Sequence, residues 1–241
     1  MNSDWLSTGV GPGFDWKEEP GGLEAVIGEP NFKAVWWLES AVRAARSVAR
    51  VLLQGGSASG FLVGPDTFMT NNHVFESAQD ARTAKLQFNY RKLADGTDAP
   101  VDEWTCDPDA LFYTHPALDY SIVKVKPKDG KKPGEMWGFF NLRHGEKVRV
   151  NERVNIIQHP QGRHQEIAFR DNKVRAVKDT FIQYLTDTDY GTSGSPVLDD
   201  WFNVVALHNQ RVADPKKPDR FYRNQGFLIT AILADAGKRL P

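Results

Sequence analysis

Short apolar runs separated by turn residues recur from residue 48 to the C-terminal end, and this pattern restricts the fold more than any other feature of the chain. The first series of runs covers residues 51–53, 60–63, 67–70, 84–90 and 120–125. Short strands at this spacing are typical of an all-β sandwich or barrel. We therefore predict an all-β unit in this half of the chain.

A second series of apolar runs begins after residues 127–134, a basic stretch rich in Pro and Gly. This stretch is predicted to be an exposed linker between two β units. The second series covers residues 147–150, 154–158, 166–169, 174–177, 181–185, 197–198, 204–207 and 226–229. Two β units of similar size fit an architecture of two packed barrels.

The two ends of the chain interrupt the strand pattern. Residues 1–30 are rich in Gly, Pro and acidic residues, which predicts an irregular arm with a short helix at 23–27. Apolar residues recur at helical spacing over 31–48 and predict an amphipathic helix, with Trp36 and Trp37 expected in the core. Another helix is expected at 231–238. The predicted organisation is an arm and helix (1–47), a first β unit (48–130) and a second β unit with the C-terminal helix (131–241).

Composition narrows the class of protein. The net charge of −1 over 241 residues gives no general attraction to nucleic acid or to an anionic membrane surface. No apolar run approaches the roughly 18 residues that a membrane-spanning helix needs. Cys106 is the only cysteine, and the first five residues do not have the pattern of a secretory signal. We therefore expect a reducing, cytoplasmic setting without structural disulfides.

One turn stands out chemically, the sequence Gly-Thr-Ser-Gly-Ser-Pro-Val at residues 191–197. Gly191 and Gly194 permit backbone conformations that other residues avoid, and Pro196 marks the start of a strand. Such a turn can present the hydroxyl of Ser193 beside backbone N–H groups, which is the arrangement that acyl transfer requires. An ordinary polar β-turn has the same residue types, so the turn alone leaves both interpretations open.

A histidine and an aspartate in the first β unit complete a possible catalytic set. His73 follows a predicted strand, and Asp119 precedes another. A serine hydroxyl needs a base, and imidazole suits this role, with an aspartate to fix its tautomer. His73 is alternatively a half-buried histidine beside a turn, and Asp119 a strand cap. Other histidines and serines compete for the same roles: His115, His144, His159, His164, His208, Ser57, Ser59, Ser121 and Ser195.

Three motifs in order decide between these alternatives: Thr-Asn-Asn-His-Val (70–74), Leu-Asp-Tyr-Ser-Ile-Val (118–123) and Gly-Thr-Ser-Gly-Ser-Pro-Val (191–197). With them the chain resembles chymotrypsin-fold serine peptidases of the bacterial trypsin-like branch, close to glutamyl endopeptidases. The resemblance spans roughly residues 48–238 and implies two packed six-stranded-type β-barrels. It further implies His73 as base, Asp119 as orienting acid, Ser193 as nucleophile, and an oxyanion hole formed by the N–H groups of Gly191 and Ser193.

Thr192 departs from the pattern of digestive trypsin-like enzymes, which have aspartate immediately before the nucleophile. In those enzymes this aspartate captures a new N-terminal amine after zymogen cleavage. A threonine cannot make that ion pair. The protein is therefore expected to be active as made, or to be gated by residues 1–47 or by a regulatory partner.

The residues that correspond to the family's primary specificity pocket give mixed signals. Thr188 and His208 occupy the positions that glutamyl endopeptidases use, and Arg211 adds a positive charge. Asp187 occupies the position that selects Arg or Lys in trypsin-like enzymes. His208 is alternatively a packed core histidine, or pairs with Asp187. On balance, cleavage after Glu or Asp is expected.

The predicted function is that of a serine endopeptidase that acts on protein or peptide substrates through an acyl-enzyme. One alternative is a protease-fold recruitment or signalling module in which proteolysis is secondary or lost, and a weaker one is an esterase. The sequence has no His-Glu-x-x-His motif and no cysteine cluster, so neither a metal nor another cofactor is expected.

Overall fold

The computed structural model describes residues 32–142, 147–214 and 216–240. Contacts divide the chain into two units, Met1–Ala34 and Val35–Pro241, and all the described helices and strands belong to the second. The short helix expected at 23–27 lies outside the described residues. Val35–Pro241 therefore contains both of the predicted β units.

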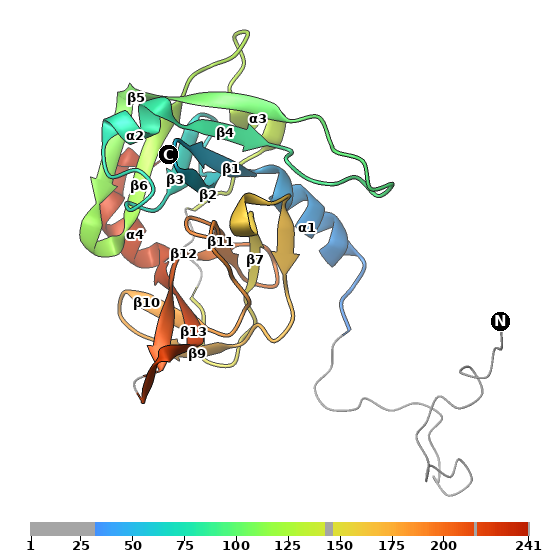
Figure 1. Cartoon of the computed structure of the whole chain (residues 1–241), viewed down its shortest axis with the longest axis vertical. Coiled ribbons are helices and arrows are strands. Elements are labelled where there is room, and N and C mark those ends of the chain that lie inside the picture. The colour runs from blue at the N-terminus through green and yellow to red at the C-terminus, as the bar shows by residue number, and fades with distance from the viewer. Residues whose placement is uncertain (1–31, 143–146, 215, 241) are drawn as a thin grey trace, which may run out of the picture. The chain divides into compact units, whose positions relative to one another are not determined.

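Six antiparallel strands close into a barrel in the order β1-β2-β3-β6-β5-β4 (Figure 1). The strands are β1 (Val48–Leu53), β2 (Gly56–Leu62), β3 (Thr67–Thr70), β4 (Lys85–Phe88), β5 (Asp102–His115) and β6 (Tyr120–Val125). The predicted all-β fold with a six-stranded barrel is therefore confirmed for the first β unit. β3 and β6 pair in register from Thr67↔Lys124 to Thr70↔Ser121, so the ends of these two strands meet at one rim of the barrel.

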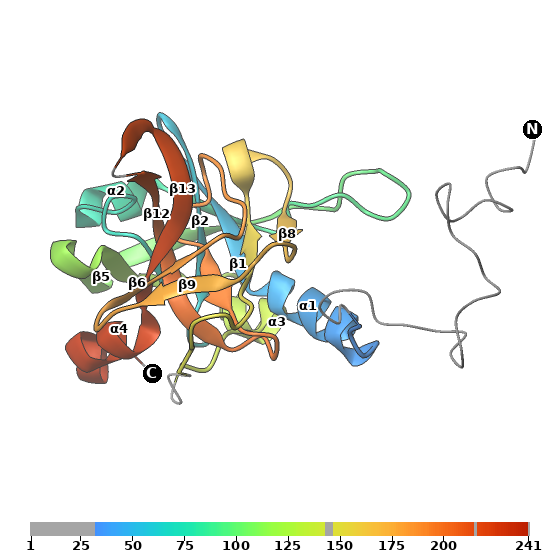
Figure 2. The same ribbon diagram turned by 90° about the horizontal axis from the view of Figure 1, so that it is seen from below.

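The second β unit is a seven-stranded sheet in the order β8-β7-β11-β12-β13-β10-β9. Strands β8, β9, β12 and β13 of this sheet are labelled in Figure 2. Its strands are β7 (Asn155–Gln158), β8 (Glu166–Ala168), β9 (Val174–Val177), β10 (Phe181–Tyr184), β11 (Pro196–Leu198), β12 (Val204–Asp214) and β13 (Lys217–Leu228). The central strand β12 pairs with β11 on one side and with β13 on the other. Ser193 lies in the connection from β10 to β11.

The described residues contain three buried apolar clusters, one of which joins the two β units. One fills the first barrel around Leu62, Phe68 and Leu86, and another lies within the second sheet around Ile156 and Val205. The third cluster draws residues from both units and from two helices: Phe61, Met69, Tyr120, Ile122, Leu198, Leu207, Trp37, Ala44, Ile229 and Ile232. Because this cluster is shared, burial of apolar surface favours the two units docked rather than apart.

The described part of the chain has four α-helices beside the β structure: α1 (Trp36–Arg46), α2 (Ala78–Thr83), α3 (Pro133–Trp137) and α4 (Ile229–Ala236). α1 is shorter than the predicted helix, because residues 32–34 are not helical and Ser47 closes its C-terminal end. Trp37 is buried as expected, whereas Trp36 is 41% exposed and stacks on Trp201. Among the described residues, no helix has the length and apolar character that crossing a bilayer requires.

Several local predictions were wrong. β5 was missed, because Asp107-Pro108-Asp109 breaks its apolar alternation and its register with β6 shifts between Asp107 and Phe112. Residues 147–150 form no strand. The predicted exposed linker ends in α3, where Pro133 and Gly134 are buried. β12 and β13 extend well beyond the predicted runs, because their outer halves are rich in polar residues and give no continuous apolar signal.

Candidate active site

Ser193 lies at the corner of two consecutive tight turns. In the first turn, Thr192 N–H donates to Asp189 O (3.1 Å), and Gly191 has φ +86°. In the second, Ser195 N–H donates to Thr192 O (2.9 Å), and Gly194 has φ +84°. Only the third residue of each turn has positive φ, which defines type II turns and explains a glycine at every third position. Ser193 is the second residue of the second turn.

Neither glycine can be replaced by a larger residue. A Cβ at Gly194 would lie 2.2 Å from both the Ser59 carbonyl oxygen and the Thr70 hydroxyl oxygen. A Cβ at Gly191 would lie 2.6 Å from the His159 carbonyl oxygen. The turn is therefore pressed against the first barrel on one side and against the segment after β7 on the other.

The hydrogen bonds of the turn orient two backbone N–H groups. The Tyr190 carbonyl accepts from Gln161 N–H, and the Thr192 carbonyl accepts from Ser195 N–H. In a trans peptide the N–H points opposite to the C=O, so the N–H groups of Gly191 and Ser193 point away from these partners. Neither N–H has an acceptor among the described residues. Two donors are thus left available beside the Ser193 side chain.

His73 and Asp119 form a close pair at the barrel rim. His73 Nδ1 lies 2.8 Å from Asp119 Oδ2, and the His73 backbone N–H donates to Asp119 Oδ1 at 3.0 Å. Asp119 has a left-handed backbone (φ 44°) and is 7% exposed. The amide of Asn71 donates to the Asp119 carbonyl at 2.9 Å, which holds this uncommon conformation in place. Both ring orientation and carboxylate position are therefore fixed by more than one contact.

Asn209 is a site residue that the sequence analysis missed. Its side-chain amide donates to Asp119 Oδ2, the same oxygen that faces His73. Asn209 lies on β12 of the second β unit, and Asp119 directly precedes β6 of the first β unit, so this bond bridges the two β units. No sequence motif indicates this contact, because the two residues lie 90 positions apart in the chain.

The Ser193 turn is anchored beside the loop that carries His73. Ser59 N–H donates to the Ser193 carbonyl at 2.9 Å, and Thr70 Oγ1 donates to the Ser59 carbonyl at 2.7 Å. Thr70 ends β3, three residues before His73. Among the hydrogen bonds of the described residues, none joins Ser193 Oγ to His73. Such bonds are often long before substrate binds.

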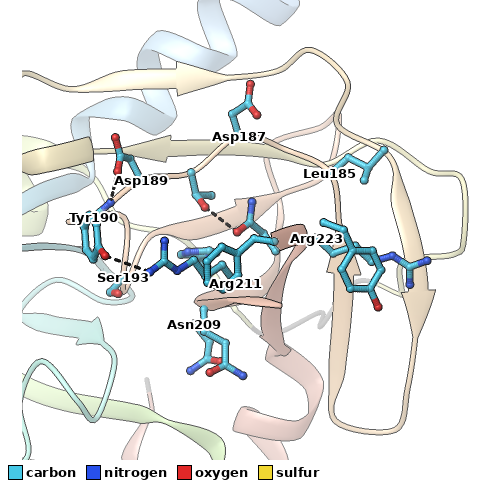
Figure 3. Close-up of a pocket in the computed structure, with 14 residues that line it drawn as sticks. Leu185, Asp187, Asp189, Tyr190, Ser193, Asn209, Arg211 and Arg223 are labelled. Atoms are coloured by element: carbon cyan, nitrogen blue, oxygen red, sulfur yellow. Dashed lines mark hydrogen bonds between the residues drawn. The ribbon is translucent and has the colours of Figure 1, made fainter. Parts of the chain in front are cut away.

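A cavity of about 520 Å³ adjoins Ser193 (Figure 3). All four predicted specificity residues line it, namely Asp187, Thr188, His208 and Arg211. The carboxylate of Asp187 is exposed and points away from Ser193 and Arg211 in Figure 3. Asp187 therefore does not occupy the cavity as an acid that selects basic substrates would.

His208 is buried at the cavity wall, with 4% of its surface exposed. Its Nδ1 lies 2.7 Å from the hydroxyl of Tyr184, so the suggested pairing with Asp187 is wrong. Burial lowers the pKa of His208 to about 3, with the nearby His73 acting in the same direction and Asp119 opposing it. Burial also raises the pKa of Tyr184 well above its ordinary value. Both side chains are therefore neutral at pH 7.

The charged groups around the cavity are held at its outer edge. Arg211 is exposed, with its guanidinium 3.9 Å from the ring centre of Phe221 and donating to the Tyr190 hydroxyl at 3.0 Å. Asp189 accepts from the side chain of Gln161 at 2.7 Å. These contacts position both charges on the rim.

The competing residues have other environments. Ser195 Oγ is fully buried and has no hydrogen-bond partner among the described residues. His159 is buried against Tyr90, and His164 pairs with Asp98 at 2.8 Å. The thiol of Cys106 is buried, which raises its pKa to about 12. In the described parts of the chain, no three His, Cys, Asp or Glu side chains gather into a possible metal site.

Comparison with known proteins assigns the family. The family model of the trypsin-like peptidase domain matches residues 58–207, a span that includes His73, Asp119 and Ser193. The chain belongs to the trypsin-like peptidase family. The predicted resemblance is thereby confirmed, and the fold of this peptidase is the one that the family implies.

Relatives of this peptidase include proteins of known and unknown activity. It is 35% identical over 216 residues to the uncharacterised protein y4fB of Sinorhizobium fredii (strain NBRC 101917 / NGR234), covering 82% of this chain and 32% of that one. It is 26% identical over 153 residues to a glutamyl endopeptidase of Staphylococcus aureus (strain MW2), covering 63% of this chain and 46% of that one. The chain thus spans less than half the length of these relatives.

A solved structure of a Glu endopeptidase in complex with MPD has the same fold as this peptidase. The TM-score is 0.58 at 19% sequence identity, and the match covers 79% of this chain and 88% of the other. Identity at this level supports the shared fold, and the roles of individual residues have to be argued from their geometry.

Proposed function

We propose that this trypsin-like peptidase is a serine endopeptidase with Ser193 as nucleophile, His73 as general base and Asp119 as orienting acid. The observation that carries the proposal is the His73–Asp119 pair at 2.8 Å, beside a turn with two N–H groups that have no acceptor among the described residues. An ordinary polar turn requires neither a neighbouring histidine–carboxylate pair nor two free N–H groups. The His73–Asp119 pair has a further contact from Asn209, which limits its motion.

The proposed reaction proceeds in two halves. Ser193 Oγ attacks the scissile carbonyl carbon while its proton passes to Nε2 of His73, and Asp119 stabilises the imidazolium through Nδ1–H. The N–H groups of Gly191 and Ser193 donate to the oxyanion that forms. The C–N bond then breaks, and the departing amine takes the proton from His73. Water repeats the sequence on the acyl-enzyme and releases the acid and free Ser193.

The proposed substrates are proteins or peptides whose residue before the scissile bond has a polar, non-basic side chain. Thr188 and the neutral His208 form the polar wall of the cavity, whereas Asp187 points away from it. The predicted preference for Glu or Asp falls within this class. Control of activity by a regulatory partner or by residues 1–47, and a cytoplasmic location, remain predictions.

A serine-directed fluorophosphonate tests the proposed nucleophile. We expect wild type and Ser195→Ala to be labelled and to cleave peptides, and Ser193→Ala to do neither. Labelling without cleavage of any peptide or protein would favour a recruitment module. Hydrolysis of small esters without hydrolysis of peptides would favour an esterase. Labelling at a residue other than Ser193 would overturn the assignment.

A further inference from the structure

The hydrogen-bond partners of Thr188 determine what this residue can offer a substrate. Asn224 donates its side-chain N–H to the Thr186 carbonyl at 2.8 Å. A carbonyl is only an acceptor, so the amide nitrogen must face Thr186, and the amide oxygen faces Thr188. The Thr188 hydroxyl donates to this oxygen at 2.8 Å. Its single proton is therefore already used, and Thr188 presents only lone pairs to the cavity.

The hydrogen bond between His208 and Tyr184 determines what His208 can offer a substrate. The Tyr184 hydroxyl is fully buried, and His208 Nδ1 is its hydrogen-bond partner among the described residues. A buried hydroxyl proton without an acceptor is unfavourable, so Tyr184 donates to Nδ1. The neutral ring then carries its proton on Nε2. His208 thus presents one donor to the cavity, and Thr188 presents one acceptor.

The charges lining the cavity do not favour an acidic side chain over a neutral one. The ionised residues are two aspartates and two arginines: Asp187, Asp189, Arg211 and Arg223. Their formal charges cancel. Arg211 is exposed, so solvent screens its attraction for a carboxylate deeper in the cavity. A carboxylate beside Thr188 would in addition face lone pairs without a proton between them.

We infer that the cavity binds a neutral carboxamide, so that the peptidase prefers glutamine over glutamate before the scissile bond. The glutamine oxygen accepts from Nε2–H of His208, and the glutamine N–H₂ donates to the Thr188 oxygen. Both His208 and Thr188 then have a hydrogen-bond partner, whereas a glutamate side chain pairs only with His208. This inference rests on the proposed function, and it replaces the acidic preference expected from sequence with a neutral polar one.

A matched peptide series with Gln, Glu, Asp, Leu or Arg before the scissile bond tests the inference in the full chain at pH 7. We expect kcat/KM for Gln to exceed that for Glu by about tenfold or more, because a carboxylate oxygen held against the Thr188 lone pairs loses a hydrogen bond that the amide makes. A Glu peptide cleaved as well as or better than the Gln peptide would overturn the inference. Cleavage that is independent of the side chain would overturn it too.

Two variants test separately the proton and the lone pairs of the Thr188 hydroxyl. Asn224→Ala frees the Thr188 proton, so the ratio of Gln to Glu cleavage should fall several-fold. Thr188→Val removes the acceptor, so Gln cleavage should fall about tenfold while Leu cleavage changes little. Thr83→Val, the same substitution on α2 of the first unit, is the matched control and should leave the ratio unchanged. An unchanged ratio in both cavity variants would contradict the inference.

Labelling separates the failure of this inference from the failure of the proposed function. Fluorophosphonate labelling of Ser193 requires the catalytic machinery and no particular substrate side chain. Product peptides that end in Gln should slow the labelling of wild type more than those that end in Glu. Absence of labelling would reject the proposed function, whereas normal labelling with equal or stronger protection by the Glu product would reject the carboxamide site alone.

Discussion

Asn209 donates a hydrogen bond to the carboxylate oxygen of Asp119 that also faces His73. The two partners belong to different β units, so the position of the orienting acid depends on how the units dock. Asn209 does not contact the reacting atoms in the proposed reaction. We regard it as a positioning residue that holds Asp119, and through it His73.

Asn209→Leu should lower kcat by about 10- to 100-fold with a smaller change in KM, because a hydrogen bond to a charged group is worth roughly 1.5–3 kcal/mol. Asn209→Ser retains a donor and should restore part of the loss. Steady-state kinetics on one peptide substrate, with the melting temperature measured in parallel, provide the test. A loss of stability with unchanged kcat would assign Asn209 a structural role only.

The two serines of the turn should respond in opposite ways to replacement. Ser193→Ala should lower kcat by about 10⁶-fold, since removal of a nucleophile leaves only binding and oxyanion donors. Ser195→Ala should retain most activity and be neutral or slightly stabilising, because its buried hydroxyl has no partner among the described residues. Peptide hydrolysis by both variants, after circular dichroism confirms folding, makes the comparison. Reversed results would show that the turn is misassigned.

Gly194→Ala should abolish activity, because the added Cβ would lie 2.2 Å from Ser59 O and Thr70 Oγ1 and would disfavour φ +84°. We expect a destabilisation of about 2 kcal/mol or more. Gly55→Ala is the matched control, because its Cβ meets nothing within 4 Å. Urea unfolding and fluorophosphonate labelling of both variants give the two readouts. Normal labelling of Gly194→Ala would mean that the turn tolerates a side chain.

Acid should destabilise the protein through two buried histidines. Burial lowers the pKa of His159 to about 4 and that of His208 to about 3, against about 6.5 in the unfolded chain. The unfolded state therefore binds more protons below pH 6.5, so stability is complete above that pH and is lost as the pH falls toward 4. The loss between pH 7 and pH 5 is roughly 2 kcal/mol for each histidine.

His159→Gln tests this pH dependence, with His164→Gln as the control at a partly exposed site. The difference between the urea midpoints at pH 7 and pH 5 should fall to about half of its wild-type value in the first variant, because His208 still contributes, and should stay unchanged in the second. Equal midpoints in wild type at the two pH values would contradict the prediction.

Acetylating or extending the N-terminus should leave activity intact. The Thr192 hydroxyl donates to Gln158 at 2.7 Å and accepts from Asp189 N–H at 3.1 Å, so the turn is supported at this position without a captured amine. Peptide hydrolysis before and after N-terminal blocking is the measurement. Strict dependence of activity on cleavage within residues 1–47 would contradict the prediction and favour gating by that segment.

The sequence predicted the features of the site that depend on local chemistry. Gly191 and Gly194 predicted a tight turn at Ser193, which the structure resolves into two consecutive turns, and His73 and Asp119 were predicted next to strands. His73 and Asp119 are brought together because β3 and β6 are neighbours. Strand pairing is a property of the whole fold, which only the family resemblance conveyed.

Contacts between distant polar residues could not be predicted. Asn209 and Asn224 both act on site residues through side-chain hydrogen bonds, and neither belongs to an apolar pattern or a motif. β12 and β13 were predicted too short for the same reason, since their outer halves are polar. Thr188 and His208 line the cavity, but their donors and acceptors depend on Asn224 and Tyr184, which the sequence does not indicate.

The Ser193 turn receives its shape from Ser59 and Thr70, which lie in the other β unit. The residues that position Ser193, the proposed nucleophile, therefore come from both halves of the chain. If the chain is divided near residue 130, each fragment alone should be inactive. Activity should return only when the two fragments reassociate, so the protein is suited to use as a split reporter. For the same reason, a chimera in which one half comes from a distant relative should be inactive. Activity should be kept only if the residues that contact the other half are transferred as well.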